Sequence, residues 1–552
     1  MEKGLSVQRS EELSIVIPAD ADRVVRFAAR ELQGYLKKML GPAFRSAIRP
    51  VSLPGTLLAP GKTKEGGFLL ARDATSVAAV DGFSITTGEN TISITGANSR
   101  SVLYGVYAFL EELGCRFVEP GIEYVPRLGN RLIPPVNKKE TAAFALRNIF
   151  RESVERKKSA PFSFLQPETV LPQIDWMAKR RLNHHDFYVD YYRYDLWEKY
   201  KQPVLEAFLD RGFTLEVTHH SLHYFCPPIE QYDFGGYGPE TYILNHPDWY
   251  VSSGYGPSYW QTRVDLPGVR KIVTERYLAY LRRNPELSIV GLWPDDGGMN
   301  RPFRGLSPTD GYLRFWNEVG RSVAREFPQK SVGIIAYFEL IHPPVKVRPK
   351  ENLHCWFCPI DAQYLVPMTD RRNSHYLKSL GGWVRNMPPL HTGIFEYYGW
   401  TPRFIPLREK MREDFRAYRD IGAGGVYAWC GYTDNILGHE YSLALDLFVF
   451  THLIWNPDAD VEHLEALWAG TVFGEAHPEI LDCYRLLRNA YYPAVKKILA
   501  QGPVVYKNVT WITLDTLHRA QKILASGRKK TRDPAVLRRI DLLEKTAANA
   551  CR

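Results

Sequence analysis

Acidic side chains stand at or just beyond the ends of five short apolar segments in the middle of the chain. They are Asp295-Asp296, Glu339, Asp361, Glu396 and Asp434. Hydrolysis of a glycosidic bond needs two carboxyl groups, a protonated one that donates to the leaving oxygen and an ionised one that activates water or attacks the sugar. Any one such acid is often a helix cap or the partner of an arginine. The complete set is more typical of a glycosidase site.

Aromatic residues border these acids. Trp, Tyr and Phe number 13, 32 and 26, which is 13% of the 552 residues. Large aromatic side chains fill cores, and they also stack on the flat apolar faces of sugar rings while keeping a polar handle. Both uses fit the count. We expect substrate contacts from Trp293, Tyr397, Tyr398 and Trp429.

Histidines and arginines supply further candidate substrate contacts. His184-His185 and His219-His220 follow two other apolar segments, and we expect them to bind sugar hydroxyls. His219 and His223 have a spacing that could hold a metal on a helix, but the segment begins as a strand and no HExxH motif occurs, so no metal is expected. Arg147 and Arg151 could hold a substrate carboxylate bidentately, with a structural ion pair as the alternative for each.

The segments that precede these side chains alternate with amphipathic helical stretches. The predicted strands are 145–153, 183–190, 213–220, 287–294, 331–338, 352–359, 392–398 and 424–430, and the predicted helices are 168–180, 195–211, 267–283, 308–327, 403–420 and 440–454. Eight strand-then-helix units predict a (β/α)8 barrel, although the helices after the fifth and sixth strands are weakly patterned. Reactive groups in such barrels lie at the C-terminal ends of the strands, where these acids stand.

Two further regions flank the predicted barrel of residues 141–457. Residues 1–140 indicate an α+β domain, with a strand at 13–18, an apolar helical stripe from Val24 to Met39 and a hairpin around 88–90. Residues 458–552 indicate helices only. A long aromatic insertion at 221–264 follows the third barrel strand, and we expect it to lie over the barrel mouth because loops of that length are usually functional.

Composition excludes several classes of protein. Hydrophobic residues make up 45% and charged residues 24%, and no apolar run reaches the roughly 20 residues of a bilayer helix. The net charge is +9, but the basic surplus lies on helix-patterned segments at the C-terminal end without a nucleic-acid-binding motif. Seven cysteines and a first segment without an apolar signal core favour a cytoplasmic protein with reduced thiols. Neither a nucleic acid nor a membrane is expected as a partner, no cofactor is expected, and a homodimer stays open.

Several motifs resemble known glycoside hydrolase families. Residues 28–36 (AARELQGYL) and 103–111 (LYGVYAFLE) resemble the domain that precedes the barrel in family 20 hexosaminidases and family 67 α-glucuronidases. Residues 113–121 (LGCRFVEPG) and 293–298 (WPDDGG) are similar to DUF4838, a related glycosidase-like family. The resemblance covers roughly residues 12–455. It implies an exo-acting glycoside hydrolase with an oligosaccharide substrate.

The α-glucuronidase resemblance implies roles for individual residues. It makes Asp296 (or Asp295) the acid, Asp361 with Glu396 the base, the mechanism inverting and a uronic-acid cap the cleaved sugar. One departure is that the acid of that family is Glu. The hexosaminidases carry an adjacent Asp-Glu pair at this strand end and use the substrate acetamido group as nucleophile, with retention; Asp295-Asp296 resembles that pair. A sugar-binding barrel without turnover is the non-enzymatic alternative.

Overall fold

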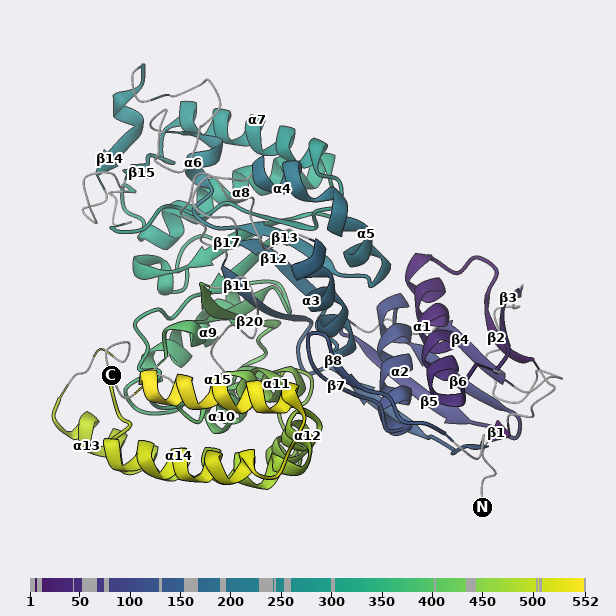
Figure 1. Cartoon of the computed structure of the whole chain (residues 1–552). Coiled ribbons are helices and arrows are strands. Elements are labelled where there is room, and N and C mark those ends of the chain that lie inside the picture. Colours follow the sequence, from purple (N-terminus) through teal and green to yellow (C-terminus); the bar gives the residue numbers. More distant parts are fainter. Residues whose placement is uncertain are drawn as a thin grey trace.

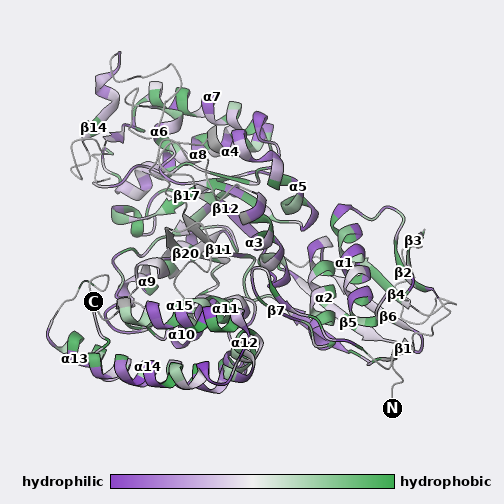
Figure 2. Ribbon diagram, viewed as in Figure 1, coloured by the Kyte–Doolittle hydropathy of each residue, from purple (hydrophilic) through white to green (hydrophobic). Residues whose placement is uncertain are grey.

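The computed structural model shows an N-terminal α/β domain, a barrel of parallel strands and a C-terminal group of helices (Figure 1). It describes residues 5–6, 12–42, 44–51, 67–73, 79–128, 132–152, 167–188, 195–227, 242, 245–252, 260–298, 303–401, 404–432, 443–502, 505 and 509–550. Figure 2 shows hydrophobic and hydrophilic residues alternating along helices such as α1 and α14, as expected where one helix face is buried.

The N-terminal domain is a six-stranded mixed sheet with two helices packed on it. Its strand order is β10-β5-β6-β4-β2-β3, with β2 at Leu13–Pro18, β3 at Ser46–Val51, β4 at Gly67–Arg72, β5 at Gly82–Thr87, β6 at Thr91–Gly96 and β10 at Lys138–Thr141. The helices are α1 (Arg23–Leu40) and α2 (Ser99–Glu112). Both begin at a capping side chain, because Asp22 and Asn98 accept backbone N–H groups of the first turn. Short pairs β1 (Leu5–Ser6) with β9 (Leu132–Ile133) and β7 (Arg116–Glu119) with β8 (Ile122–Tyr124) complete it.

Eight parallel strands form the nearly closed barrel, in the order β11-β20-β19-β18-β17-β16-β13-β12. Their bounds are Leu146–Glu152 (β11), His184–Tyr188 (β12), Thr214–Thr218 (β13), Ile289–Gly291 (β16), Ser331–Ala336 (β17), Leu353–Phe357 (β18), Thr392–Glu396 (β19) and Gly425–Tyr432 (β20). All eight predicted strands therefore form. The gap between β11 and β12 is bridged by Asn183, whose backbone N–H donates to the Arg147 carbonyl and whose Oδ1 accepts the Arg147 N–H.

The helices around the barrel differ from prediction in two places. The predicted helix 195–211 forms as two, α4 (Asp195–Tyr200) and α5 (Gln202–Asp210), with Pro203 in the first turn of α5, where its missing N–H is tolerated. After the fifth barrel strand, β17, only the 3-10 turn η3 (Phe338–Ile341) follows, whereas α9 (Ser374–Asn386) follows the sixth, β18. The other barrel helices are α3 (Pro167–Lys179), α7 (Pro267–Arg283), α8 (Pro308–Glu326), α10 (Leu407–Ile421) and α11 (Ala444–Leu453).

The insertion after β13 and the C-terminal tail contain the remaining elements. The described part of the insertion holds α6 (Leu222–Phe225), the 3-10 turn η2 (Pro247–Trp249) and the antiparallel pair β14 (Tyr250–Ser252) and β15 (Trp260–Thr262). The tail is helical, as predicted, with α12 (Val461–Phe473), η5 (Gly474–Ala476), α13 (His477–Ala500), α14 (Leu514–Arg528) and α15 (Pro534–Ala550).

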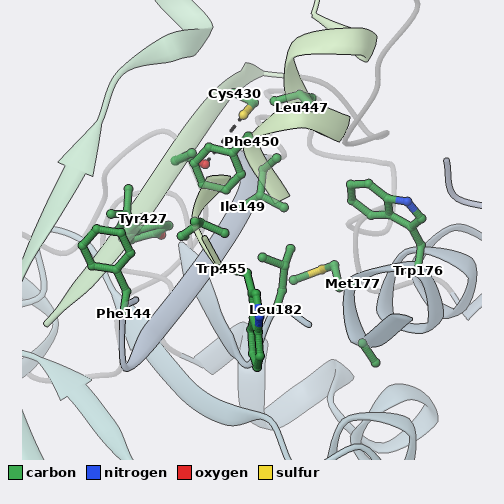
Figure 3. Close-up of a cluster of buried hydrophobic side chains, with 14 of the residues drawn as sticks. Phe144, Ile149, Trp176, Met177, Leu182, Tyr427, Cys430, Leu447, Phe450 and Trp455 are labelled. Atoms are coloured by element: carbon green, nitrogen blue, oxygen red, sulfur yellow. Dashed lines mark hydrogen bonds between the residues drawn. The ribbon is translucent and has the colours of Figure 1, made fainter. Parts of the chain in front are cut away.

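A buried hydrophobic core joins barrel and helices. In Figure 3, Ile149 of β11 lies near Leu447 and Phe450 of α11, and Trp176 and Met177 of α3 lie on the other side of the group. The N-terminal domain docks at the N-terminal ends of the first barrel strands. There Asp81 accepts hydrogen bonds from Arg147 Nη2 (2.6 Å) and Asn183 Nδ2 (2.8 Å). Asp81 and Arg147 form an ion pair whose two side chains are fully buried.

Candidate active site

Asp296 lies just beyond the C-terminal end of β16, on the side of the barrel where active sites form. Its carboxylate Oδ1 accepts a hydrogen bond from the Tyr337 hydroxyl (3.0 Å), and Nε2 of His220 lies 3.4 Å from the same oxygen. The side chain is 14% exposed, so a ligand can reach it. Tyr337 follows β17 and His220 follows β13, so strands on both sides of β16 fix this carboxyl group.

Asp295 turns away from solvent, as expected of adjacent residues at a strand end. Its side chain is fully buried, with Oδ2 3.3 Å from His223 Nδ1 and Oδ1 accepting the backbone N–H of Asp296 (2.9 Å). Gln261 of β15 donates its side-chain amide to the Asp295 carbonyl (2.5 Å). The two aspartates therefore have separate environments, one enclosed and one open to the mouth.

The histidines after β13 are part of this site. The rings of His219 and His220 pack against each other with centroids 4.4 Å apart and their planes tilted by 48°. His219 has a backbone φ of 113°, an unfavourable value for a residue with a Cβ, and such strain concentrates at functional sites. Nδ1 of His220 lies 2.6 Å from the Pro294 carbonyl, which directs Nε2 toward Asp296.

Aromatic rings run in contact from β16 to β20 beside these acids. Trp293 and Phe395 have ring centroids 6.5 Å apart, and Phe395 lies 4.7 Å from Tyr397. Tyr397 stacks on Trp400 at 5.2 Å, and Trp400 meets Trp429 edge-on at 4.8 Å. The buried Trp293 Nε1 has no hydrogen-bond partner among the described residues. Trp293, Phe395, Tyr397 and Trp429 in this aromatic wall are buried, whereas Trp400 is partly exposed and is the ring that a sugar could reach.

Glu396 and Tyr398 do not lie with the other predicted site residues. Glu396 faces away from the barrel interior, because Phe395 beside it faces inward and side chains alternate along a strand. The Tyr418 hydroxyl of α10 donates to Glu396 Oε1 (2.5 Å), and Tyr398 packs on Phe450 of α11. The structure therefore corrects their predicted places: both belong to the layer between strands and helices.

Asp361 follows β18 on the expected side of the barrel but is exposed. Burial, and after it the nearby negative charge of Asp361, raises the pKa of the Tyr376 phenol on α9 to about 12. No contact in the described part of the chain joins Asp361 to Asp296. Its predicted role as base stays a prediction.

None of the three predicted substrate contacts Arg147, His185 and Arg151 is placed at the barrel mouth by the described residues. Arg147 forms the buried ion pair with Asp81, so the structural alternative holds and its predicted substrate contact is corrected. His185 stacks on Phe208 of α5 (4.8 Å) outside the barrel, away from the mouth. The side chain of Arg151 lies outside the described residues.

The barrel interior contains a polar cluster that the sequence analysis did not identify. His184 lies here rather than at the mouth, with Nε2 2.7 Å from Glu216 Oε2, and Trp356 Nε1 donates to Glu216 (3.1 Å). Beside it, Asp186 Oδ2 accepts hydrogen bonds from the hydroxyl groups of Thr218 and Tyr427. Asp186 Oδ1 and both side-chain polar atoms of Asn148 have no hydrogen-bond partner among the described residues.

Burial sets the protonation of this interior cluster. It raises the pKa of Glu216 to about 8, and with the charge of Glu216 it raises the pKa of Asp186 to about 7. Burial lowers the pKa of His184 to about 4. The signal that could have revealed the cluster is the period of two: His184 and Asp186, like Glu216 and Thr218, lie two residues apart and share the inner face.

The described residues contain no group of three or more His, Cys, Asp and Glu side chains arranged to hold a metal. Cys355 and Cys358 are buried free thiols, as are the other four described cysteines. No helix in the described ranges is long and apolar enough to span a membrane.

Comparison of the sequence with known families decides the classification. The profile of DUF4838, a domain of unknown function, matches residues 117–484. The chain belongs to the DUF4838 family. The profile of the glycosyl hydrolase family 67 N-terminus matches residues 2–109 of this DUF4838 protein. No curated protein matches its sequence.

Solved structures share the fold of this DUF4838 protein at low sequence identity. A family 138 glycoside hydrolase that targets pectin rhamnogalacturonan II matches with a TM-score of 0.63 and 10% identity, over 98% of this chain and 68% of that one. A family 115 4-O-methyl-α-glucuronidase matches with 0.62 and 12%, over 99% and 72%. A family 20 β-N-acetylhexosaminidase from Streptomyces coelicolor matches with 0.53 and 14%, over 85% and 92%. The shared architecture is the (β/α)8 barrel with its preceding α/β domain.

Proposed function

We propose that this DUF4838 protein is an exo-acting glycoside hydrolase in which Asp296 is the general acid. The observation that carries the proposal is the position of Asp296, which is partly exposed just beyond the C-terminal end of β16 and is held by Tyr337 and His220. Trp293, the first ring of the aromatic wall, precedes it by three residues. A recessed carboxyl group beside stacking rings suits the end of an oligosaccharide. Asp296 protonates the glycosidic oxygen as the bond breaks, and the aromatic rings hold the departing sugar.

The geometry favours a substrate-assisted, retaining mechanism. Of the two carboxylates predicted to activate water, Glu396 faces the helix layer and Asp361 is exposed. Asp295, by contrast, is next to the acid, and its enclosed carboxylate is oriented by His223. In this mechanism the substrate's 2-acetamido oxygen attacks the anomeric carbon while the negative charge of Asp295 stabilises the positive charge that develops on the acetamido group. The family 20 hexosaminidase shares this fold, which supports the reading.

An inverting, α-glucuronidase-like hydrolase is the second candidate. The match to the family 67 N-terminus and the shared fold of the family 115 α-glucuronidase favour it. Asp296 is again the acid, and Asp361 takes the base role and activates water from the opposite face of the sugar. The sugar removed is then a terminal uronic acid.

The deciding experiment is a hydrolysis screen with an aryl N-acetyl-β-hexosaminide and a uronic-acid-capped xylo-oligosaccharide, followed by NMR of the anomeric proton. Release of N-acetylhexosamine with retained configuration supports the first mechanism, and release of a uronic acid with inversion supports the second. Asp295→Asn abolishes turnover only in the first, and Asp361→Asn only in the second. Full activity of Asp296→Asn on the cleaved substrate would overturn both.

A further inference from the structure

A large pocket lies outside the barrel, beside the elements that carry the candidate acid. Its volume is about 1010 Å³. One wall comes from residues 263–266 and 270, just after β15, and another from Phe303, Arg304 and Leu306 before α8. The first wall continues from Gln261, which donates to the Asp295 carbonyl, and the second wall follows Asp296 in the chain. The pocket is therefore built on the same two loops as the candidate active site.

The lining of the pocket is strongly basic. Its basic residues are Arg263, Arg270, Arg304, Arg314, Arg321, Lys346 and Arg348, against the acids Asp265 and Glu318. Arg263 pairs with Asp265 (2.6 Å) and Arg270 with Glu318 (2.8 Å), which uses both acids. Within the described ranges, no carboxylate lies at ion-pair distance from the other five cations, and all five are exposed.

The wall that carries Lys346 and Arg348 is rigidly attached to α8. Asp310 Oδ1 accepts the backbone N–H groups of residues 345, 346 and 347 at 3.2, 2.9 and 2.8 Å. Burial of Asp310 opposes its charge, but these hydrogen bonds outweigh it and hold its pKa below the ordinary value. Asn317 donates its side-chain amide to the Arg348 carbonyl (2.9 Å). The backbone that carries these two cations is thus fixed to α8, and their exposed side chains extend from it.

Apolar side chains line the pocket between the cations. Phe303 is half-buried and lies directly over Gly311 of α8, where an added Cβ would meet the ring at 2.1 Å. Phe315, Leu266 and Val347 extend this lining. Guanidinium groups bind carboxylates through two parallel hydrogen bonds, and an aromatic ring stacks on a sugar face.

We propose that this pocket is a second binding site that takes an acidic oligosaccharide through its carboxylates. Arg314 and Arg321 of α8 face Lys346 and Arg348 of the loop across the ligand, and Phe303 stacks on one of its sugar rings. The choice of a saccharide rests on the proposed function, whereas the preference for an anion rests on the lining alone. The site would hold a charged chain beside the barrel mouth and raise its local concentration there.

The test is calorimetric titration of the Asp296→Asn protein with trigalacturonic acid at low salt, with its methyl ester as the neutral probe. Working in the Asp296→Asn background prevents turnover. We expect binding of the acid only, and about tenfold weaker binding for each carboxylate–guanidinium pair lost in Arg314→Gln/Arg321→Gln. The control is Arg282→Gln/Arg325→Gln, which removes the same charge from α7 and α8 outside the pocket and should leave the affinity unchanged.

Other outcomes overturn the site. Absence of binding, equal binding of the methyl ester, or unchanged affinity in Arg314→Gln/Arg321→Gln would each contradict it. Failure of the proposed hydrolase function would be seen separately, as an inactive wild-type protein in the hydrolysis screen. A wild-type protein that binds trigalacturonic acid in the pocket but cleaves no substrate would support the second binding site and contradict the proposed hydrolase function.

Discussion

Two neighbouring aspartates with the same chemistry are given different surroundings at the end of β16. Asp296 reaches the barrel mouth and is held by Tyr337 and His220, whereas Asp295 is enclosed and held near His223. A proton donor must meet its substrate, and a charge that stabilises an intermediate acts best in a site shielded from water. The burial of Asp295 and the exposure of Asp296 therefore suit the two different roles that we propose for them.

The orientation of Glu396 predicts that it is dispensable for the chemistry. Glu396→Gln keeps the shape of the side chain and can still accept the Tyr418 hydroxyl bond. We expect its kcat to stay within about tenfold of wild type, against a loss of about 10²–10⁴-fold in Asp296→Asn, because a general acid contributes that much. Steady-state kinetics on the substrate found in the screen compare the two. Equal losses would put Glu396 back among the catalytic residues.

The interior carboxyl groups predict a pH dependence of stability. Unfolded Asp and Glu have pKa values of about 3.9 and 4.3, whereas Asp186 and Glu216 titrate near 7 and 8 in the fold. The folded state therefore holds these protons more tightly. The stability they contribute is complete below about pH 4 and is lost as pH rises through 7 and 8.

Asp186→Asn removes one of these titrations while keeping both hydrogen-bond partners on an oxygen. We expect its Tm to fall less than that of wild type between pH 5.5 and 8.5 in thermal unfolding followed by circular dichroism. A Tm difference between variant and wild type that does not change with pH would contradict the prediction.

At the scale of elements, sequence periodicity predicted the strands well and their side-chain directions poorly. All eight barrel strands form near their expected positions, because alternating apolar runs and amphipathic helices report burial directly. Whether a residue at a strand end faces inward depends on its register with neighbouring strands, which one sequence does not contain. For that reason the sequence did not reveal that Asp296 reaches the mouth whereas Glu396, Tyr398 and His185 face the surrounding helices.

A glycine in a barrel strand leaves space for an aromatic ring of the interior, because it has no Cβ atom. A Cβ on Gly393 of β19 would lie 2.2 Å from the Trp356 ring, whereas a Cβ on Gly34 of α1 would meet nothing within 4 Å. We expect Gly393→Ala to destabilise the protein by about 1–3 kcal/mol or more through overpacking. Gly34→Ala is the matched control and should stabilise the helix by about 0.5–1 kcal/mol. Urea unfolding measures both, and similar midpoints would contradict the packing argument.

At the scale of the whole molecule, one buried ion pair joins two parts of the chain. Asp81 of the N-terminal domain receives Arg147 of β11 and also Arg100 of α2. Burial opposes the charge of Asp81, but the two guanidinium groups outweigh it and hold the pKa of Asp81 well below its ordinary range. The pair is therefore ionised at all ordinary pH values.

Removing one partner of this ion pair should weaken the attachment of the N-terminal domain to the barrel and lower the stability of the protein. We expect Arg147→Met to cost about 3–5 kcal/mol, because it leaves a buried carboxylate with one cation fewer. Differential scanning calorimetry should show a lower Tm. The exposed pair Arg282–Glu326 provides the control, and Arg282→Gln should leave Tm nearly unchanged. Equal decreases in Tm for Arg147→Met and Arg282→Gln would contradict the larger contribution to stability that we expect from Arg147.

The docking of the N-terminal domain has a practical consequence for the barrel mouth. Arg147 and Asn183 lie at the starts of their strands, and Arg100 reaches Thr214 at the start of β13, so the domain is attached at the end of the barrel opposite Asp296. Protein immobilised on a bead through the N-terminal domain would therefore present its mouth to the surrounding liquid. The chain ends of a polymer that is too large to diffuse into the pores of the bead could then still reach the barrel mouth.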